Sequence, residues 1–324
     1  LMKLIDMHCD TAMKLLSQPE MDLCNPSLEV NLPALIQAHS MVEFFACFTD
    51  FQSYAAPPTQ AYDYGYQNVL DMIQRMNLET ERYSDQIALA SNLTQIRKND
   101  SVNKISVFLT VEEGGILNGK MERLYHLYQQ GIRLITLTWN YENSLGFPNS
   151  SHPETMSRGL KPFGFEVIEE MNRLGIIIDV SHLSDGGFWD VLEHSKKPVV
   201  ASHSCVRELC NHSRNLSQEM IRAIGNQGGV IGVNFYGGFL HPDGVSTAQR
   251  IAQHIRMIAD ISGIETAAIG SDLDGGISAN PLEIHTISLI DLLYDQLQKA
   301  HFSADQIDKI FFENALRVIG ETTV

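Results

Sequence analysis

The amino-acid sequence predicts a single (β/α)8 barrel. Short apolar runs, typical of buried parallel strands, alternate along the chain with stretches in which apolar residues recur at helical spacing. Two of these runs, Ile176–Val180 and Val199–Ala201, both lead into Ser-His, and the spacer between them is long enough for a crossover helix. No G-x-G-x-x-G or G-x-x-x-x-G-K-[ST] pattern follows any run, which disfavours the alternative of a doubly wound nucleotide-binding sheet. We therefore expect one domain over residues 1–324.

The composition narrows the functional classes. The net charge of −16, from 39 acidic and 23 basic residues, argues against nucleic acid or an anionic membrane surface as a partner. Five cysteines without a C-x-x-C pattern fit a reducing compartment. No apolar run reaches the roughly 20 residues of a membrane span, and the first residues lack the apolar region of a signal peptide. We expect a cytoplasmic protein.

In the first half of the chain, residues 11–40 are expected to form a loop because of their prolines. Helical spacing then begins at Thr59, and Ser91 is a suitable N-cap for a short helix. Further helices are expected over Met121–Gln130 and residues 163–174. The eight expected strands share a short apolar, β-branched composition: Lys3–Met7, Val42–Thr49, Ile105–Val111, Leu134–Thr138, Ile176–Val180, Val199–Ala201, Gly229–Phe235 and Ala267–Gly270.

A long polar loop is expected from Tyr141 to about Lys161, and such loops are usually functional lids or disordered. In the second half, Ser217 should cap a helix, and another should end at Gly263. Ser303 and Gln306 have the spacing of a capping box before the last helix.

Six side chains that can bind a metal follow the expected strands: His8, Asp10, Glu113, His182, His203 and Asp272. Because parallel strands end at one rim of a barrel, we expect these groups to lie together there. Imidazole and carboxylate ligands suit zinc. The set is too large for one tetrahedral ion, so it favours a two-metal site, in which Glu113 could give one oxygen to each ion.

The chain resembles the membrane (renal) dipeptidase family of the amidohydrolase superfamily. The matching stretches run from residue 5 to residue 275: IDMHCD, VEEGG, GLKPFGFEVIEEMNRLGIIIDVSH, PVVASHS, SRN, GVNFY and GSDLDG. The resemblance implies two zinc ions, one held by His8, Asp10 and Glu113 and the other by Glu113, His182 and His203. Glu113 is preferred to Glu112 because the family glutamate directly precedes the glycine pair.

The resemblance also assigns Asp272 as the general acid and base, and Arg214 as the group that binds the substrate carboxylate. Trp139, followed by Asn140, stands where well-known members carry a histidine that contacts the substrate. Phe239 stands where the mammalian enzyme has a substrate-contacting tyrosine. We therefore expect a retained metal site and an altered substrate pocket, with Arg214, Trp139, Asn140 and Phe239 as substrate contacts.

The expected function is zinc-dependent hydrolysis of free dipeptides by a metal-bridged hydroxide. By resemblance, a D-residue at the C-terminal position is tolerated and the protein forms a homodimer. One alternative is another amidohydrolase reaction, such as the hydrolysis of N-acyl amino acids or lactones. The other is a non-catalytic metal- or peptide-binding barrel, which the presence of Asp272 beside a full ligand set disfavours.

Overall fold

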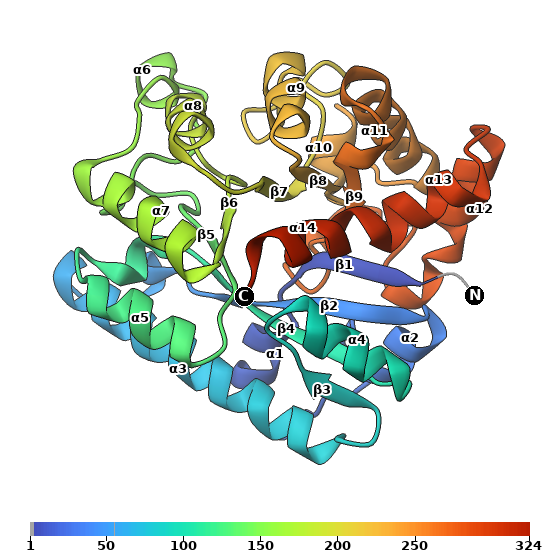
Figure 1. Ribbon diagram of the computed structural model, residues 1–324, viewed down its shortest axis with the longest axis horizontal. Coiled ribbons are helices and arrows are strands. Elements are labelled where there is room, and N and C mark those ends of the chain that lie inside the picture. The colour runs from blue at the N-terminus through green and yellow to red at the C-terminus, as the bar shows by residue number, and fades with distance from the viewer. Residues whose placement is uncertain (1–2, 55) are drawn as a thin grey trace.

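The computed structural model describes residues 3–54 and 56–324 and contains a closed barrel of eight parallel strands (Figure 1). The ring runs β1-β2-β4-β5-β6-β7-β8-β9 and returns to β1, so the predicted fold class is confirmed. The strands have these bounds: β1 Leu4–Cys9, β2 Ser40–Phe48, β3 Ile87–Leu89, β4 Ile105–Glu112, β5 Leu134–Thr136, β6 Ile177–Asp179, β7 Val199–Ser204, β8 Val230–Val233 and β9 Ala267–Ile269.

The ninth strand, β3, lies outside the ring and was not predicted from the sequence. Its three residues pair with Ile105–Val107 at the start of β4. They use the same edge of β4 with which β5 pairs at residues 110–112. A run of three residues is too short to carry a hydrophobic period, which explains why the sequence did not indicate it.

Helices surround the ring and mostly confirm the predicted positions. Residues 11–40 are an exception, because they contain α1 and α2 where a loop was expected. Asn92, not Ser91, caps α4 by accepting a hydrogen bond from the Gln95 amide. The α-helices have these bounds: α1 Thr11–Ser17, α2 Leu32–Gln37, α3 Pro58–Arg82, α4 Leu93–Ser101, α5 Met121–Gln129, α6 Pro153–Met156, α7 Pro162–Leu174, α8 Asp185–His194, α9 Gln218–Asn226, α10 Gly237–Leu240, α11 Ala248–Ser262, α12 Asp291–Lys299, α13 Ala304–Asp308 and α14 Asn314–Thr322. In the described part of the chain, no helix is both long and apolar enough to cross a membrane.

The expected helix ends are largely present. Ser217 caps α9, Gly175 and Gly263 end α7 and α11, and Ser303 forms the predicted capping box with Gln306. The polar segment after β5 contains one short helix, α6. These agreements follow from capping chemistry, which acts between residues close in sequence.

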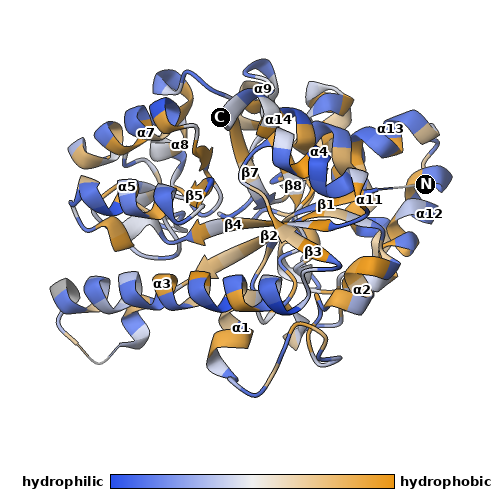
Figure 2. Ribbon diagram, turned by 60° about the horizontal axis from the view of Figure 1, so that its bottom comes forward, coloured by the Kyte–Doolittle hydropathy of each residue, from blue (hydrophilic) through white to orange (hydrophobic). Residues whose placement is uncertain are grey.

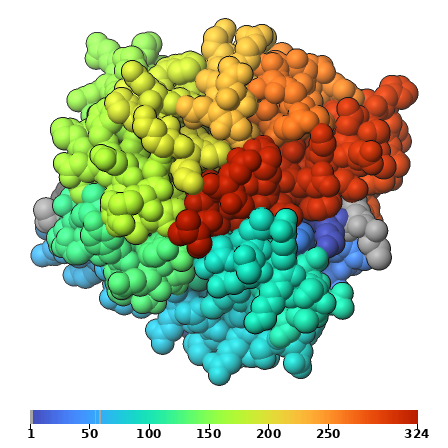
Figure 3. Space-filling view, viewed as in Figure 1, coloured from blue at the N-terminus to red at the C-terminus, as the bar shows by residue number. Residues whose placement is uncertain are grey.

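The barrel interior is filled by apolar side chains, and α14 closes one end of it. The ring strands contribute one compact cluster, in which Phe44 and Phe108 stack with their ring centroids 4.5 Å apart. Val318 and Ile319 of α14 join this cluster. Figure 2 shows the central strands coloured as hydrophobic, and Figure 3 shows the red C-terminal segment packed against the cyan and yellow surfaces. The opposite rim of the barrel is therefore the end at which functional groups can lie.

We predict that Phe44→Ala lowers the free energy of unfolding by about 3–5 kcal/mol, because the fully buried ring leaves a cavity against Phe108. Urea denaturation followed by circular dichroism measures this change. Leu78→Ala is the matched control, since the Leu78 side chain on α3 is 54% exposed and its removal should cost less than about 1 kcal/mol. Equal losses in the two variants would contradict this description of the core.

Candidate active site

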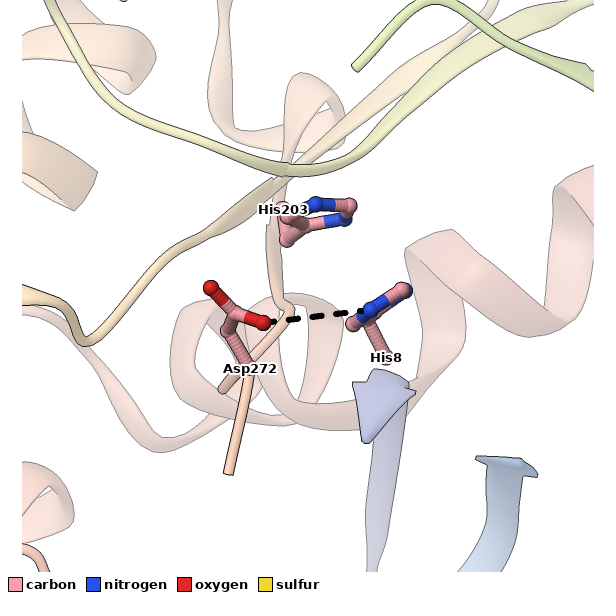
Figure 4. A group of neighbouring side chains, drawn as sticks. All are labelled: His8, His203 and Asp272. Atoms are coloured by element: carbon pink, nitrogen blue, oxygen red, sulfur yellow. Dashed lines mark ion pairs between the residues drawn. The ribbon is translucent and has the colours of Figure 1, made fainter. Parts of the chain in front are cut away.

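Metal-competent side chains from five ring strands converge at the rim where the strands end. His8 belongs to β1, Glu112 ends β4 and His203 belongs to β7, while His182 and Asp272 follow β6 and β9. These side chains are buried or nearly so. Figure 4 shows His203 and Asp272 lying beside His8, whose Nε2 is 3.8 Å from Asp272 Oδ1. Parallel strand direction alone brings these distant segments together, as the sequence predicted.

Glu112 is at the centre of this group. Its Oε2 lies 3.5 Å from His8 Nε2, while its Oε1 lies 3.1 Å from His182 Nε2 and 3.4 Å from His203 Nε2. Asp10 Oδ2 approaches His8 Nε2 on the first side, at 3.7 Å. Two sets of groups that share Glu112 could therefore hold a metal ion, one of His8, Asp10 and Glu112 and one of Glu112, His182 and His203. A third group with suitable spacing consists of His8, His203 and Asp272. One carboxylate faces both sets.

The structure thus places Glu112, and not Glu113, at the position among the histidines that was expected for Glu113. The Glu113 carboxylate instead accepts hydrogen bonds from the Trp139 and Gly115 amides, at 2.8 and 2.7 Å, and from Asn143 Nδ2 at 2.6 Å. Successive strand residues point to opposite faces, and Glu113 has left-handed backbone geometry with φ 84°. The chain therefore turns away from the centre immediately after Glu112.

The glycine at position 115 is required by this turn. A Cβ atom on Gly115 would lie 2.3 Å from Glu113 Oε1, so only glycine fits beside the buried carboxylate. Burial raises the pKa of Glu113 to about 7, against the opposing effect of its three hydrogen bonds. Glu113 holds the start of the loop after β5 in place.

Hydrogen bonds from a surrounding layer orient two of the imidazoles. Asn140 Oδ1 lies 3.0 Å from His182 Nδ1, which leaves Nε2 directed toward Glu112. His203 Nδ1 lies 2.8 Å from Ser202 Oγ, and that hydroxyl donates to Asp179. Partners of this kind fix the tautomer of a metal-binding histidine. Asn140, which was expected to contact substrate, supports His182 and also lines the cavity over the centre, so that expectation stays a prediction. Asp179 was not found from the sequence.

The buried carboxylates of the centre require positive charge beside them. Burial by itself lowers the pKa of His8, but the Glu112 and Asp10 carboxylates outweigh it and raise that pKa well above its usual value. Burial lowers the pKa of His182 to about 4 and that of His203 well below its usual value. Neutral imidazoles and ionised carboxylates are the states that metal ions bind.

The donor atoms present also fit a metal centre. His8 Nδ1 and Nε2, Asp10 Oδ1 and Glu112 Oε1 are buried without a hydrogen-bond partner in the described chain. Unpaired buried polar atoms are costly, and a cation would satisfy several of them together. Histidine nitrogen combined with carboxylate oxygen is a ligand set that suits zinc.

Asp272 lies at the edge of the centre in a left-handed backbone conformation, with φ 63°. Asn234 Nδ2 donates to its Oδ2 at 2.8 Å, which leaves Oδ1 facing His8. Burial raises the pKa of Asp272 to about 7. Asp274, two residues later, is committed elsewhere, because its carboxylate accepts hydrogen bonds from Thr11 and Lys14 and from nearby backbone amides.

Arg214 is brought beside this centre by the loop after β7. The side chain is buried, and its two terminal nitrogens donate to His203 O at 3.0 Å and Ser204 Oγ at 3.3 Å. Its Nε is buried without a hydrogen-bond partner in the described chain, and the guanidinium carbon lies 5.2 Å from the centroid of the Phe239 ring. The predicted placement of Arg214 near the metal-competent groups is confirmed, and its role stays a prediction.

A cavity of about 270 Å³ opens over the centre. Asp10, Glu112, His182 and Asp272 line it, together with aromatic side chains that include Trp139 and Phe239. This volume lies at the low end of the range for small-molecule sites, so it suits a compact ligand. A larger groove between α9, α11 and α12 contains none of the metal-competent groups of the centre.

Comparison with known proteins agrees with this geometry. The model of the membrane dipeptidase family, peptidase family M19, matches residues 1–324. An uncharacterized dipeptidase of Schizosaccharomyces pombe is 31% identical over 303 residues, which cover 90% of this chain and 72% of that protein.

Two solved structures share the fold. A metallopeptidase from Rhodobacter sphaeroides, bound to a phosphinate mimic of the dipeptide L-Ala-D-Ala, matches with a TM-score of 0.88 and 23% identity over 99% of both chains. The probable dipeptidase PvdM of Pseudomonas aeruginosa also matches with a TM-score of 0.88, at 19% identity over 99% of this chain and 95% of its own.

We predict that Glu112→Gln loses most of its bound metal, whereas Glu113→Gln keeps the metal content of the unaltered protein. A neutral amide cannot serve two cations, while the Glu113 side chain contacts only the backbone and Asn143. Elemental analysis of the purified variants by mass spectrometry measures the difference. The reverse result, with metal lost only in Glu113→Gln, would restore the assignment made from the sequence.

Proposed function

The chain belongs to the membrane dipeptidase family and is a metallodipeptidase by that membership, and we propose that it hydrolyses free dipeptides with zinc at the rim of the barrel. The observation that supports this most directly is Glu112, whose two oxygens face separate sets of metal-competent groups beside the acid Asp272.

Two zinc ions are the proposed cofactor. One would be held by His8, Asp10 and Glu112, and the other by Glu112, His182 and His203. Zinc supplies Lewis acidity, which polarises a carbonyl group and activates water at neutral pH.

Asp272 is the proposed group that moves the proton. A carboxyl group with a pKa near neutrality can both accept and release a proton at the pH of the cell, and burial gives Asp272 such a pKa in the protein alone. Because Asn234 holds Oδ2, Oδ1 is the atom that takes the proton from the attacking water and passes it to the leaving amine. No covalent intermediate with the protein is required.

Arg214 is the proposed anchor for the carboxylate of the substrate. Its guanidinium is buried next to the metal-competent histidines and its Nε lacks a protein partner, so a carboxylate there would complete its hydrogen bonding. A fixed carboxylate sets the distance from the C-terminus to the scissile bond. This distance selects dipeptides over longer chains.

The stereochemistry of the second residue is part of the proposal. The Rhodobacter sphaeroides structure was solved with a mimic of L-Ala-D-Ala, which supports acceptance of a C-terminal D-residue here. The test of the function is the release of free amino acids from a panel of L,L and L,D dipeptides, with and without a chelator. Absence of turnover on the whole panel with zinc supplied would overturn the proposal.

We predict that Asp272→Asn lowers kcat by ~10²–10⁴-fold while the fold and the metal content are retained. The amide keeps the size of the side chain and a hydrogen-bond acceptor for Asn234, but it cannot carry the proton. Steady-state kinetics and elemental analysis on the same preparation give the two readouts. A kcat within threefold of the unaltered enzyme would assign the proton transfer to another group.

We predict that Arg214→Met lowers kcat/KM for free dipeptides by about tenfold or more, from loss of a charged hydrogen bond of about 1.5–3 kcal/mol. The variant should also discriminate much less between a dipeptide and its C-terminal amide. Arg207→Met is the matched control, because Arg207 lies in the same loop but pairs with Asp185 at 2.8 Å. Equal hydrolysis of acid and amide by the unaltered enzyme would exclude Arg214 as the anchor.

A further inference from the structure

The two ends of the active-site cavity belong to opposite sides of the barrel. In the ring of eight strands, β2 and β7 are four places apart, as are β4 and β8. Arg214 and Phe239 follow β7 and β8, whereas Phe48 and Trp139 lie at the ends of β2 and β5, on either side of β4. Phe48, Trp139 and Phe239 all line the cavity, and the strand order places the first two across the ring from the third.

This separation fixes the direction in which a dipeptide would lie. If the carboxylate binds at Arg214, the chain must cross the metal-competent groups toward β2 and β5. Two residues extend at most about 7 Å, and the centroid of the Trp139 ring lies 6.2 Å from that of the His182 ring. The side chain of the N-terminal residue would therefore meet Phe48 and Trp139.

That wall is aromatic and is held rigidly. The centroids of the Phe48 and Trp139 rings are 4.8 Å apart, and the centroid of the Tyr141 ring lies 5.4 Å from that of Trp139 in an edge-on arrangement. The Trp139 amide donates to the buried Glu113 carboxylate at 2.8 Å, which fixes the backbone from which the indole extends. Glu113 is thus a positioning residue for this wall.

The chemistry of the cavity lining indicates which side chains fit there. Around the acids and His182, the remaining lining residues are mostly apolar or aromatic, and the described lining contains no lysine or arginine. The buried Arg214 adjoins the lining residue Phe239 and is not itself a lining residue. A carboxylate side chain would find no basic partner at this wall. A polar amide group would lose water against two aromatic rings.

We propose that Phe48 and Trp139 form a subsite that selects dipeptides with an aromatic or large aliphatic N-terminal side chain. This inference rests on the proposed dipeptidase function and on the anchoring of the carboxylate at Arg214. Contact between the substrate side chain and the indole face buries apolar surface and allows offset stacking of an aromatic residue. Trp139 therefore determines specificity at the N-terminal residue, and Glu113 acts through it.

The test uses two dipeptides of identical composition, Phe-Ala and Ala-Phe, with the zinc-loaded enzyme. Trp139→Ala should lower kcat/KM for Phe-Ala by at least tenfold and for Ala-Phe by less than threefold. Trp139→Phe keeps an aromatic face and should restore most of the activity on Phe-Ala. Trp189→Ala is the matched control, because the second tryptophan of the chain is 45% exposed on α8 and should leave both substrates unaffected.

A binding measurement keeps the inference testable if a Trp139 variant folds poorly. In the double variant Trp189→Phe with Asp272→Asn, Trp139 is the single tryptophan and turnover is slowed. Saturating Phe-Ala should change the Trp139 fluorescence of this variant more than saturating Ala-Ala does. Equal changes would overturn the subsite.

The kinetic outcomes separate this inference from the function on which it rests. Failure to hydrolyse any dipeptide would overturn the proposed function itself. An equal effect of Trp139→Ala on kcat/KM for Phe-Ala and Ala-Phe would overturn only the subsite. The enzyme would then be a dipeptidase that does not select the N-terminal side chain at this wall.

Discussion

The burial of one carboxylate among three imidazoles is the constraint on which this molecule depends. Glu112 can remain ionised inside the barrel rim only because His8, His182 and His203 surround it. Those groups come from β1, β4, β7 and the segment after β6, so their meeting requires a closed ring of parallel strands. The ring in turn needs the apolar cluster inside it and the helix α14 that closes its other end. The stability of the core and the geometry of the centre are therefore linked.

A second layer of hydrogen bonds makes this centre rigid before any ligand arrives. Asp179 holds Ser202, which meets His203, while Asn140 meets His182 and Asn234 holds Asp272. Each of these partners uses one polar atom of the functional group and leaves the other directed inward. Preorganisation of this kind lowers the reorganisation needed during a reaction, which is a large part of how enzymes stabilise charge.

The adjacent residues Glu112 and Glu113 have divided roles. Glu112 faces two sets of metal-competent groups, and Glu113 turns aside to hold the backbone at Trp139 and the loop residue Asn143. A chain in which both carboxylates faced the centre would place two buried negative charges side by side, at a high electrostatic cost. The left-handed turn at Glu113 avoids that cost and uses the second carboxylate to position an aromatic wall of the cavity.

The sequence by itself determined the barrel, most of its helices and five of the six groups at the rim, because these depend on local periodicity and on the direction of parallel strands. It placed His8, Asp10, His182, His203 and Asp272 correctly near one another. The choice between Glu112 and Glu113 needed the tertiary structure. Alternation along β4 indicates that the two point to opposite faces, but only the packing of Phe108 inside the barrel shows which face is inward.

The short strand β3 and the helices α1 and α2 were likewise decided by tertiary contacts, since three to seven residues carry too little periodicity to be recognised. The supporting roles of Asp179, Asn234 and Asn143 depend on partners 23 to 38 residues away in the chain. Spacing along a sequence does not specify such contacts, because they exist only after the strands and loops have been brought together by folding.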